Sequence, residues 1–226
     1  MGVSKQQAAE NRRTILEASE KLFREHGIDG IGLSALMKAA GFTQGGFYNH
    51  FASKEALAAE VVATAMARAN ADLKAAVAAP LAAGQTRLGR QVDYYLSNTH
   101  CSDVGQGCAV AALSAEVRRL GGEAQMHFAA GLREMIGTLV GLVAEQQPDL
   151  GAEAAREHAI AFYCEMVGAL FLARAVAEAD PNLAEMILAS GRHALIHGKK
   201  EGQGSALDKL GPSRDCVLRT TAPDPG

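Results

Sequence analysis

The sequence predicts an all-α protein. Proline lacks a backbone amide donor and is poorly tolerated inside helices, and before residue 198 it occurs only at Pro80, Pro148 and Pro181. Between these prolines the chain is rich in Ala, Leu, Glu, Gln and Arg, which are good helix formers. No segment shows the sustained alternation of apolar and polar residues that is typical of a β-strand.

Length and charge favour two domains with different partners. The 226 residues suffice for a small domain and a larger one, and 48% hydrophobic with 21% charged residues indicates a folded protein with a packed core. The net charge is −3, but residues 1–54 carry seven Lys or Arg against five Asp or Glu, whereas residues 55–226 carry fifteen against twenty. This mild asymmetry favours an N-terminal segment that faces a polyanion.

The cysteines and the N-terminus indicate a reducing compartment. Cys101, Cys108, Cys164 and Cys216 form no CxxC pair and are too sparse for a disulfide scaffold. The N-terminus lacks the apolar core of a signal peptide, and no uncharged apolar run is long enough to span a bilayer. We therefore expect a cytoplasmic protein with reduced thiols and no membrane partner.

Four helices are expected in close succession at the N-terminus. Apolar residues at helical spacing predict a first helix at 7–26, which Gly27 ends as a left-handed stop. Ser34 is expected to cap a second, short helix, and Thr43 and Ser53 a third and a fourth. The boundaries that follow are a first domain at 7–54, a second at 55–197, and a disordered tail at 198–226, where Gly, Pro and charged residues accumulate.

The second domain is predicted to be a helical bundle. Its expected helices span residues 84–98, 107–119, 122–146, 152–179 and 181–197. The last two carry apolar residues over much of their circumference, so they must be covered from more than one side. This suits the centre of a bundle or the interface of a homodimer.

Residues 31–57, IGLSALMKAAGFTQGGFYNHFASKEAL, carry the strongest functional signal. They encode two short helices joined by a tight turn at Gly41, and the second helix is too small and too polar on one side to be core alone. A helix-turn-helix that reads the major groove of DNA requires this arrangement. The AAG turn, YxHF and SKExL resemble the TetR family of transcriptional regulators over residues 10–60. The resemblance implies a homodimeric repressor with a C-terminal domain for dimerisation and ligand sensing, which a small-molecule effector releases from a palindromic operator.

Each residue of this motif has an expected role. Gly45 and Gly46 should each cost a helix about 1 kcal/mol relative to alanine, which suggests that they let the backbone approach the groove; the alternative is that they permit close helix packing. Gln44 is expected to pair with a base edge. The resemblance places Tyr48, His50 and Lys54 at phosphate contacts, to which Thr43 and Ser34 add hydroxyls or helix amides.

Two neighbouring positions have alternative interpretations. Asn49 reaches a base or phosphate, or is a solvated polar residue. His50 is either a DNA contact or a packing histidine. Three aromatic residues of the motif are expected in the core instead, together with Ile15, Phe23 and Leu36: Phe42, Phe47 and Phe51.

The stretch CSDVGQGCAVAALSAEVRR resembles one branch of the family, in which some members sense electrophiles or oxidants through a cysteine that follows a glycine. Cys108 is the candidate, because the amides of a helix N-terminus stabilise a thiolate; the alternative is a small buried residue at a helix start. Cys101, seven residues earlier, is either its partner or has no role. Cys164 is expected to pack in an apolar helix, and Cys216 to lie in the tail.

No catalytic or metal motif stands out. GxSxG, GxxxxGK and HExxH are absent, and His193 and His197 have no further ligands nearby, so we expect no enzyme, metal or cofactor. The alternatives to a DNA-binding regulator are a helical enzyme and a protein-binding adaptor. A mainly apolar effector pocket has candidates that are equally ordinary core residues, namely Tyr94, Tyr95, Met126, Phe128, Met135 and Tyr163.

Overall fold

The computed structural model describes residues 4–198, and this range is all-helical. Residues 199–226 and the predicted tail with Cys216 lie outside the described residues. The elements are α1 (Lys5–His26), α2 (Leu33–Ala39), the short 3-10 helix η1 (Gln44–Asn49), α3 (Lys54–Ala78), α4 (Arg87–Tyr95), α5 (Asn98–Ser102), α6 (Ala109–Leu120), α7 (Gly122–Gln146), α8 (Ala152–Val176) and α9 (Pro181–His197).

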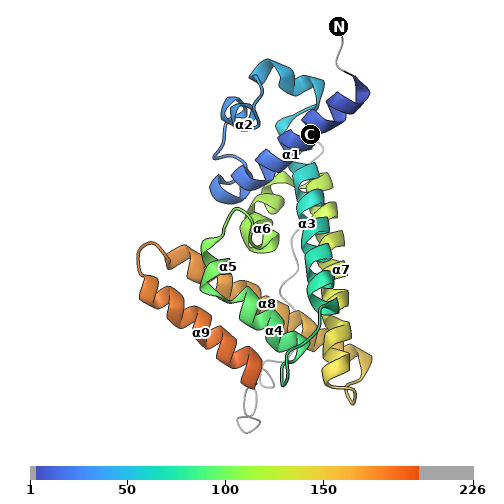
Figure 1. Ribbon diagram of the computed structural model, residues 1–226, viewed down its shortest axis with the longest axis vertical. Helices are drawn as coiled ribbons and strands as arrows, with labels where there is room; N and C mark the ends of the chain where they lie inside the picture. Colours follow the sequence, from blue (N-terminus) through green and yellow to red (C-terminus); the bar gives the residue numbers. More distant parts are fainter. Residues whose placement is uncertain (1–3, 199–226) are drawn as a thin grey trace, which may run out of the picture.

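The N-terminal elements form one end of the molecule (Figure 1). α1 packs against α2 and α3, and α2 against η1. The predicted core of this unit is confirmed, because Ile15, Phe23, Leu36 and Phe47 are fully buried. Gly27, with a φ of 74°, ends α1 as predicted.

The helices of the larger unit mostly agree with their predicted ranges. The predicted helix at 84–98 is the main exception, because the chain forms two helices there, α4 and α5. Ser97 causes the break: its hydroxyl accepts a hydrogen bond from the amide of His100 at 3.1 Å and so begins α5 as an N-cap.

Helices α3 and α7 run side by side along one edge of the molecule (Figure 1). At their crossing a Cβ on Gly131 would lie 2.6 Å from the Cβ of Met66, which is closer than real side chains approach. The buried Asn70 side chain donates to the carbonyl of Gly131 at 3.0 Å and so joins the two helices. Only glycine fits this seam without moving a helix.

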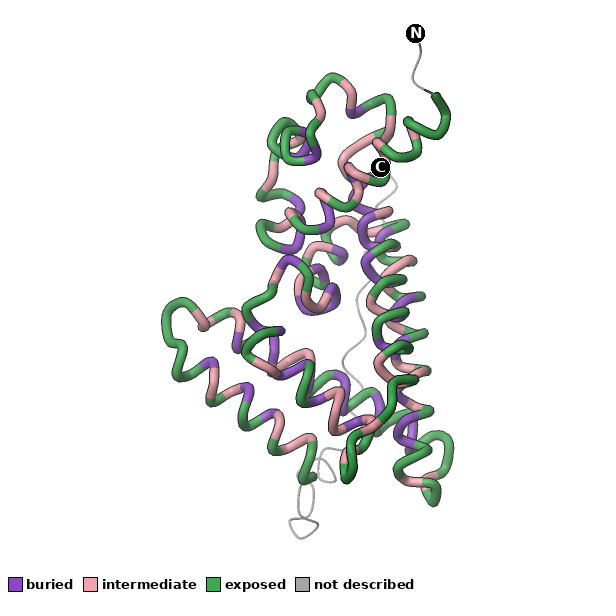
Figure 2. The backbone as a smooth tube through the Cα atoms, viewed as in Figure 1, coloured by how far each residue is buried: buried purple, intermediate pink, exposed green. Residues whose placement is uncertain are grey.

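Helices α8 and α9 pack against each other, and α8 also packs against α7. By length and composition alone α8 is apolar enough to cross a membrane, a test that core helices of soluble proteins also pass. Figure 2 shows buried and exposed positions mixed along both helices. Large apolar side chains exposed on the pair, which we call the α8–α9 face, are Ile160, Phe171, Leu172, Leu183, Met186 and Ile196.

The seam generates a stability prediction. Gly131→Ala should lower the free energy of unfolding by about 1–3 kcal/mol, because the added methyl forces α3 and α7 apart. Gly137→Ala is the matched control on the same helix, since its Cβ would meet no atom within 4 Å. It should raise stability by about 0.5–1 kcal/mol through helix propensity. Urea unfolding measures both changes, and equal effects would contradict the tight seam.

Candidate functional site

The turn between α2 and η1 presents a polar segment at the end of the molecule. Gly41 has a φ of 83°, a conformation that favours glycine, and the amide of Phe42 bonds back to the carbonyl of Met37 at 2.8 Å. A Cβ at Gly45 or Gly46 would meet no atom within 4 Å. Packing within the chain therefore does not require either glycine, which argues against the packing alternative.

The predicted cap at Ser34 is wrong, and the predicted cap at Thr43 is correct in position only. Ser34 lies inside α2, which begins at Leu33 with Gly32 as the N-cap. Thr43 occupies the N-cap position of η1, but its side chain makes no capping hydrogen bond. The predicted third helix is a 3-10 helix of six residues, as expected for a short piece that contains two glycines. Ser53 does cap α3, because its hydroxyl accepts from the amide of Ala56 at 3.1 Å.

The predicted contact residues share one stretch of accessible chain. Tyr48 is 71% exposed, and its ring stands edge-on to the buried ring of Phe47 at 5.3 Å between centroids. His50 and Lys54 are partly exposed. The other predicted contacts that are exposed are Ser34, Thr43, Gln44, Gly45 and Asn49, while Gly46 is partly exposed.

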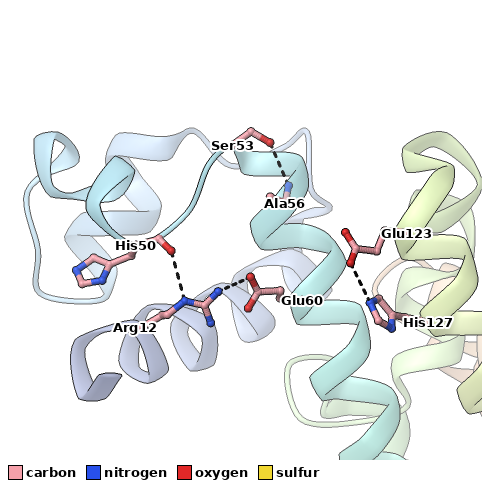
Figure 3. Close-up of polar contacts among 7 residues, drawn as sticks. All are labelled: Arg12, His50, Ser53, Ala56, Glu60, Glu123 and His127. Carbon is pink, nitrogen blue, oxygen red and sulfur yellow. Dashed lines mark hydrogen bonds and ion pairs between the residues drawn. The ribbon is translucent and has the colours of Figure 1, made fainter. Parts of the chain in front are cut away.

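Arg12 of α1 holds the end of this segment in place (Figure 3). Its Nε donates to the carbonyl of His50 at 3.3 Å, and its Nη2 forms an ion pair with Glu60 of α3. The guanidinium carbon also lies 4.5 Å from the ring centroid of Phe51. Arg12 thus connects α1, the end of η1 and α3. In the sequence alone it cannot be distinguished from a surface arginine.

A buried ion pair lies further along α1. Glu20 and Arg24 are 3% and 7% exposed, and Glu20 Oε1 lies 2.5 Å from Arg24 Nη2. Arg68 of α3 pairs with the other carboxylate oxygen at 3.0 Å. Arg24 Nη1 donates to the carbonyl of Gly107 at 2.7 Å, and burial lowers the pKa of Arg24. The two charges were not predicted to be buried, although their i, i+4 spacing beside Phe23 permits the pairing.

The segment 100–107 accepts hydrogen bonds from two arginines, Arg24 of α1 and Arg174 of α8. Arg174 of α8 donates to the carbonyl of His100 at 2.8 Å and to that of Asp103 at 3.2 Å. A Cβ on Gly107 would lie 2.3 Å from the backbone carbonyl oxygen of Asp103 and equally close to Arg174 Nη2, so only glycine fits at this position. A second link joins α6 to the residues after α1, because the amide of Ile28 donates to Glu116 at 3.3 Å.

A cavity of about 260 Å³ opens beside this segment. Four predicted pocket residues line it, and two do not. Met126 is 66% exposed on the surface of α7, and Phe128 packs half-buried against the core, so those two predictions are wrong. The residues that line the cavity include Leu73, Tyr94, Tyr95, His100, Gly107, Cys108, Met135, Leu139, Tyr163 and Met166.

Cys108 is the N-cap of α6 and faces the cavity, half-buried. Its Sγ accepts a hydrogen bond from the amide of Ala111 at 3.4 Å and one from the hydroxyl of Tyr95 at 2.8 Å. Burial raises the pKa of Tyr95, so this hydroxyl keeps its proton. The sulfur thus lies at a helix N-terminus and accepts two hydrogen bonds.

The other cysteines lie in different surroundings. Cys101 is buried, and burial raises the pKa of its thiol. Cys164 is exposed on α8, so the prediction that it packs in the core is wrong: it falls on the side of the helix that its neighbours do not cover. The rings of His193 and His197 are 4.8 Å apart, and residues 4–198 hold no group of three or more side chains suited to a metal ion.

Residues 15–61 match the family model of bacterial regulatory proteins of the tetR family. We call this matched segment the TetR domain. This TetR domain contains α2, η1 and the start of α3, and thus every predicted DNA contact.

The sequence similarity to known relatives extends over different lengths of this chain. The regulator AcrR of Shigella flexneri is 40% identical over 58 residues, which cover 26% of this chain and 27% of AcrR. The repressor BepR of Brucella suis is 27% identical over 182 residues, 73% of this chain and 80% of BepR. The chain thus spans less than a third of the AcrR length.

The fold is shared beyond that domain. The crystal structure of Escherichia coli NemR in its reduced form superposes with a TM-score of 0.64 at 24% identity, over 80% of this chain and 95% of NemR. At this identity the likeness shows a common all-helical fold, with the N-terminal helix-turn-helix followed by the larger helical unit.

Proposed function

We propose that the protein is a homodimeric transcriptional repressor that binds a palindromic operator and is released by a small-molecule effector or by modification of Cys108. The observation that carries this proposal is the exposed segment 43–50 within the TetR domain. Its polar side chains and its two unobstructed glycines are what a backbone close to DNA requires. The names of the relatives, regulators and repressors, agree with it, and no observation favours an enzyme or an adaptor.

The contacts divide by chemistry. Gln44 and Asn49 carry amides that can pair with base edges, and Gly45 beside them adds no bulk. Tyr48, His50 and Lys54 donate to phosphates, together with the hydroxyls of Thr43 and Ser34. Arg12 positions this set through the carbonyl of His50. The side-chain contacts to base edges then determine which DNA sequence is preferred. The phosphate contacts determine the register of the protein on the DNA and its affinity.

The α8–α9 face supports dimer formation. It consists of six large apolar side chains that the described chain leaves 39–65% exposed. Contiguous exposed apolar patches mark interaction sites, and a second copy provides a self-complementary cover by two-fold symmetry. Such a dimer presents two recognition segments to successive major grooves.

Coupling between the cavity and the TetR domain runs through Gly107. This residue lines the cavity, and its carbonyl accepts the hydrogen bond from Arg24 of α1. A ligand or a modified Cys108 that displaces the Gly107 peptide must also move or release Arg24. Because Arg24 is buried, it cannot replace that bond with water at low cost, so the displacement shifts α1.

The DNA contacts generate a prediction for the proposed repressor. Tyr48→Phe with His50→Ala should lower affinity for DNA upstream of the gene at least about tenfold, since each loses a phosphate contact. Lys54→Ala should reduce the slope of log affinity against log salt by about 1. Fluorescence anisotropy over a salt series measures both effects. Lys74→Ala removes the same charge far from this surface and should change neither; unchanged binding by the double variant would instead support the enzyme or adaptor alternative.

Cys108 modification generates a separate prediction. A mild oxidant or a quinone should release operator DNA from the wild-type protein and from the Cys164→Ser variant, which removes an exposed thiol that does not line the cavity. Cys108→Ser should stay bound. Equal release from all three proteins would eliminate Cys108 as the switch and leave it the packing role.

The Arg24 link is tested by the same release assay. Arg24→Met keeps the apolar stem but removes the bond to Gly107, while Glu20 keeps Arg68. Modification of Cys108 should weaken operator binding of the wild-type protein about 5- to 150-fold and that of Arg24→Met much less. Arg68→Met, which contacts Glu20 alone in this cluster, should respond like wild type. A full response from Arg24→Met would rule out this route.

A further inference from the structure

The cavity beside the segment 100–107 has the size of a compact ligand. Its volume is about 260 Å³, whereas an apolar cavity of about 150 Å³ holds benzene. Leu73, Met135, Leu139 and Met166 form apolar walls. One substituted aromatic ring therefore fits this space.

His100 presents a hydrogen-bond acceptor at the cavity. It is 7% exposed and lines the cavity, and its Nδ1 lies 2.7 Å from the carbonyl oxygen of Tyr95. Because a carbonyl can only accept, Nδ1 carries the ring proton. Burial lowers the pKa of His100, and the positive charge of Arg174 adds to that shift, so the ring is neutral at pH 7. The second ring nitrogen, Nε2, therefore keeps its lone pair.

This Nε2 atom is available to a ligand. Within residues 4–198 it has no hydrogen-bond partner, and protein atoms do not enclose it. The bond from Nδ1 to Tyr95 and the ring of Tyr94, stacked on His100 at 5.3 Å between centroids, fix the orientation of the imidazole. A Cβ on Gly107, another lining residue, would lie 3.3 Å from Nε2. The lone pair thus lies next to the cavity wall at Gly107.

An acceptor in such a place selects ligands that bring a hydrogen-bond donor. A cationic donor is disfavoured, because the guanidinium of Arg174, which binds the carbonyl of His100 at 2.8 Å, repels a second positive charge. A phenol hydroxyl is an uncharged donor at pH 7. The apolar walls and the exposed, cavity-lining ring of Tyr94 favour an aromatic body for the ligand.

We propose that the cavity binds a compact phenol, whose hydroxyl donates a hydrogen bond to Nε2 of His100 while its ring packs against the apolar walls. This inference rests on the proposed function only in taking the cavity as the effector site. It names the chemical class of the effector, which is an aromatic ring with an uncharged hydroxyl. The recognition is non-covalent and does not involve the Cys108 sulfur.

Matched one-ring probes test the class. Isothermal titration of the full chain at pH 7 compares p-cresol with its methyl ether, which has lost the donor, and with p-xylene, in which a methyl group replaces the hydroxyl. Cresol should bind about tenfold more tightly than either, because it alone satisfies His100. Equal binding of the ether or of xylene would overturn the proposal, as would the absence of cresol binding at millimolar concentration.

His100→Asn tests the role of Nε2. The asparagine amide nitrogen takes the place of Nδ1 and can still donate to Tyr95, but no atom remains at the Nε2 position. The substitution should lower cresol affinity about tenfold and leave xylene affinity unchanged. His127→Asn is the matched control on α7, partly exposed and away from the cavity lining, and should change neither. Unchanged cresol binding by a folded His100→Asn variant would overturn the assignment.

Nitrogen NMR of the wild-type chain tests the same contact without a variant. In the free protein, Nε2 of His100 should give the resonance of an unprotonated nitrogen, and saturation with cresol should shift it towards the hydrogen-bonded position, whereas xylene should not. A protonated Nε2 in the free protein at pH 7, or no shift with cresol, would overturn the proposal. Neither titration nor NMR uses DNA, so a failure here is distinguishable from a failure of the repressor proposal.

Discussion

The Glu20–Arg24 pair and its bond to Gly107 constrain the rest of the structure. A buried guanidinium must keep its partners, since losing one partner of a buried charge pair costs about 3–5 kcal/mol. Arg24 takes one partner from its own helix and another from the wall of the cavity. Arg24 therefore links the TetR domain to the cavity wall, so a displacement of the Gly107 peptide also affects this charged group. The close packing of α3 against α7 at Gly131 holds these two helices together, so that a displacement of Arg24 would move α1 relative to them.

Much of the fold follows from local signals in the sequence. The ranges of α7 and α9 were predicted to the residue, because Gly121, Pro148 and Pro181 punctuate long helix-forming stretches. Gly27 and Ser53 ended and began helices as predicted, since caps act within one turn of the chain. The aromatic core of the first domain followed from apolar spacing. These features depend on neighbours only a few residues away.

The parts that were missed depend on tertiary contacts. The break at Ser97, the burial of Glu20 and Arg24, and the exposure of Cys164 and Met126 are decided by which helix packs on which face. Composition alone made Cys164 a core residue, but its side of α8 belongs to the surface that the described chain leaves uncovered. Only four of the six predicted pocket residues line the cavity, because the sequence does not show which residues of α4 and α8 come together when the bundle forms.

In the proposed repressor, a symmetric dimer reads DNA with the segment 43–50. Footprinting of the purified full chain on DNA flanking its own gene tests this most directly. The proposed dimer should protect two half-sites related by two-fold symmetry, with centres about 10–10.5 base pairs or a multiple apart. This protection should disappear as salt rises. Absence of protection at low salt, or a single asymmetric site that is insensitive to salt, would contradict it.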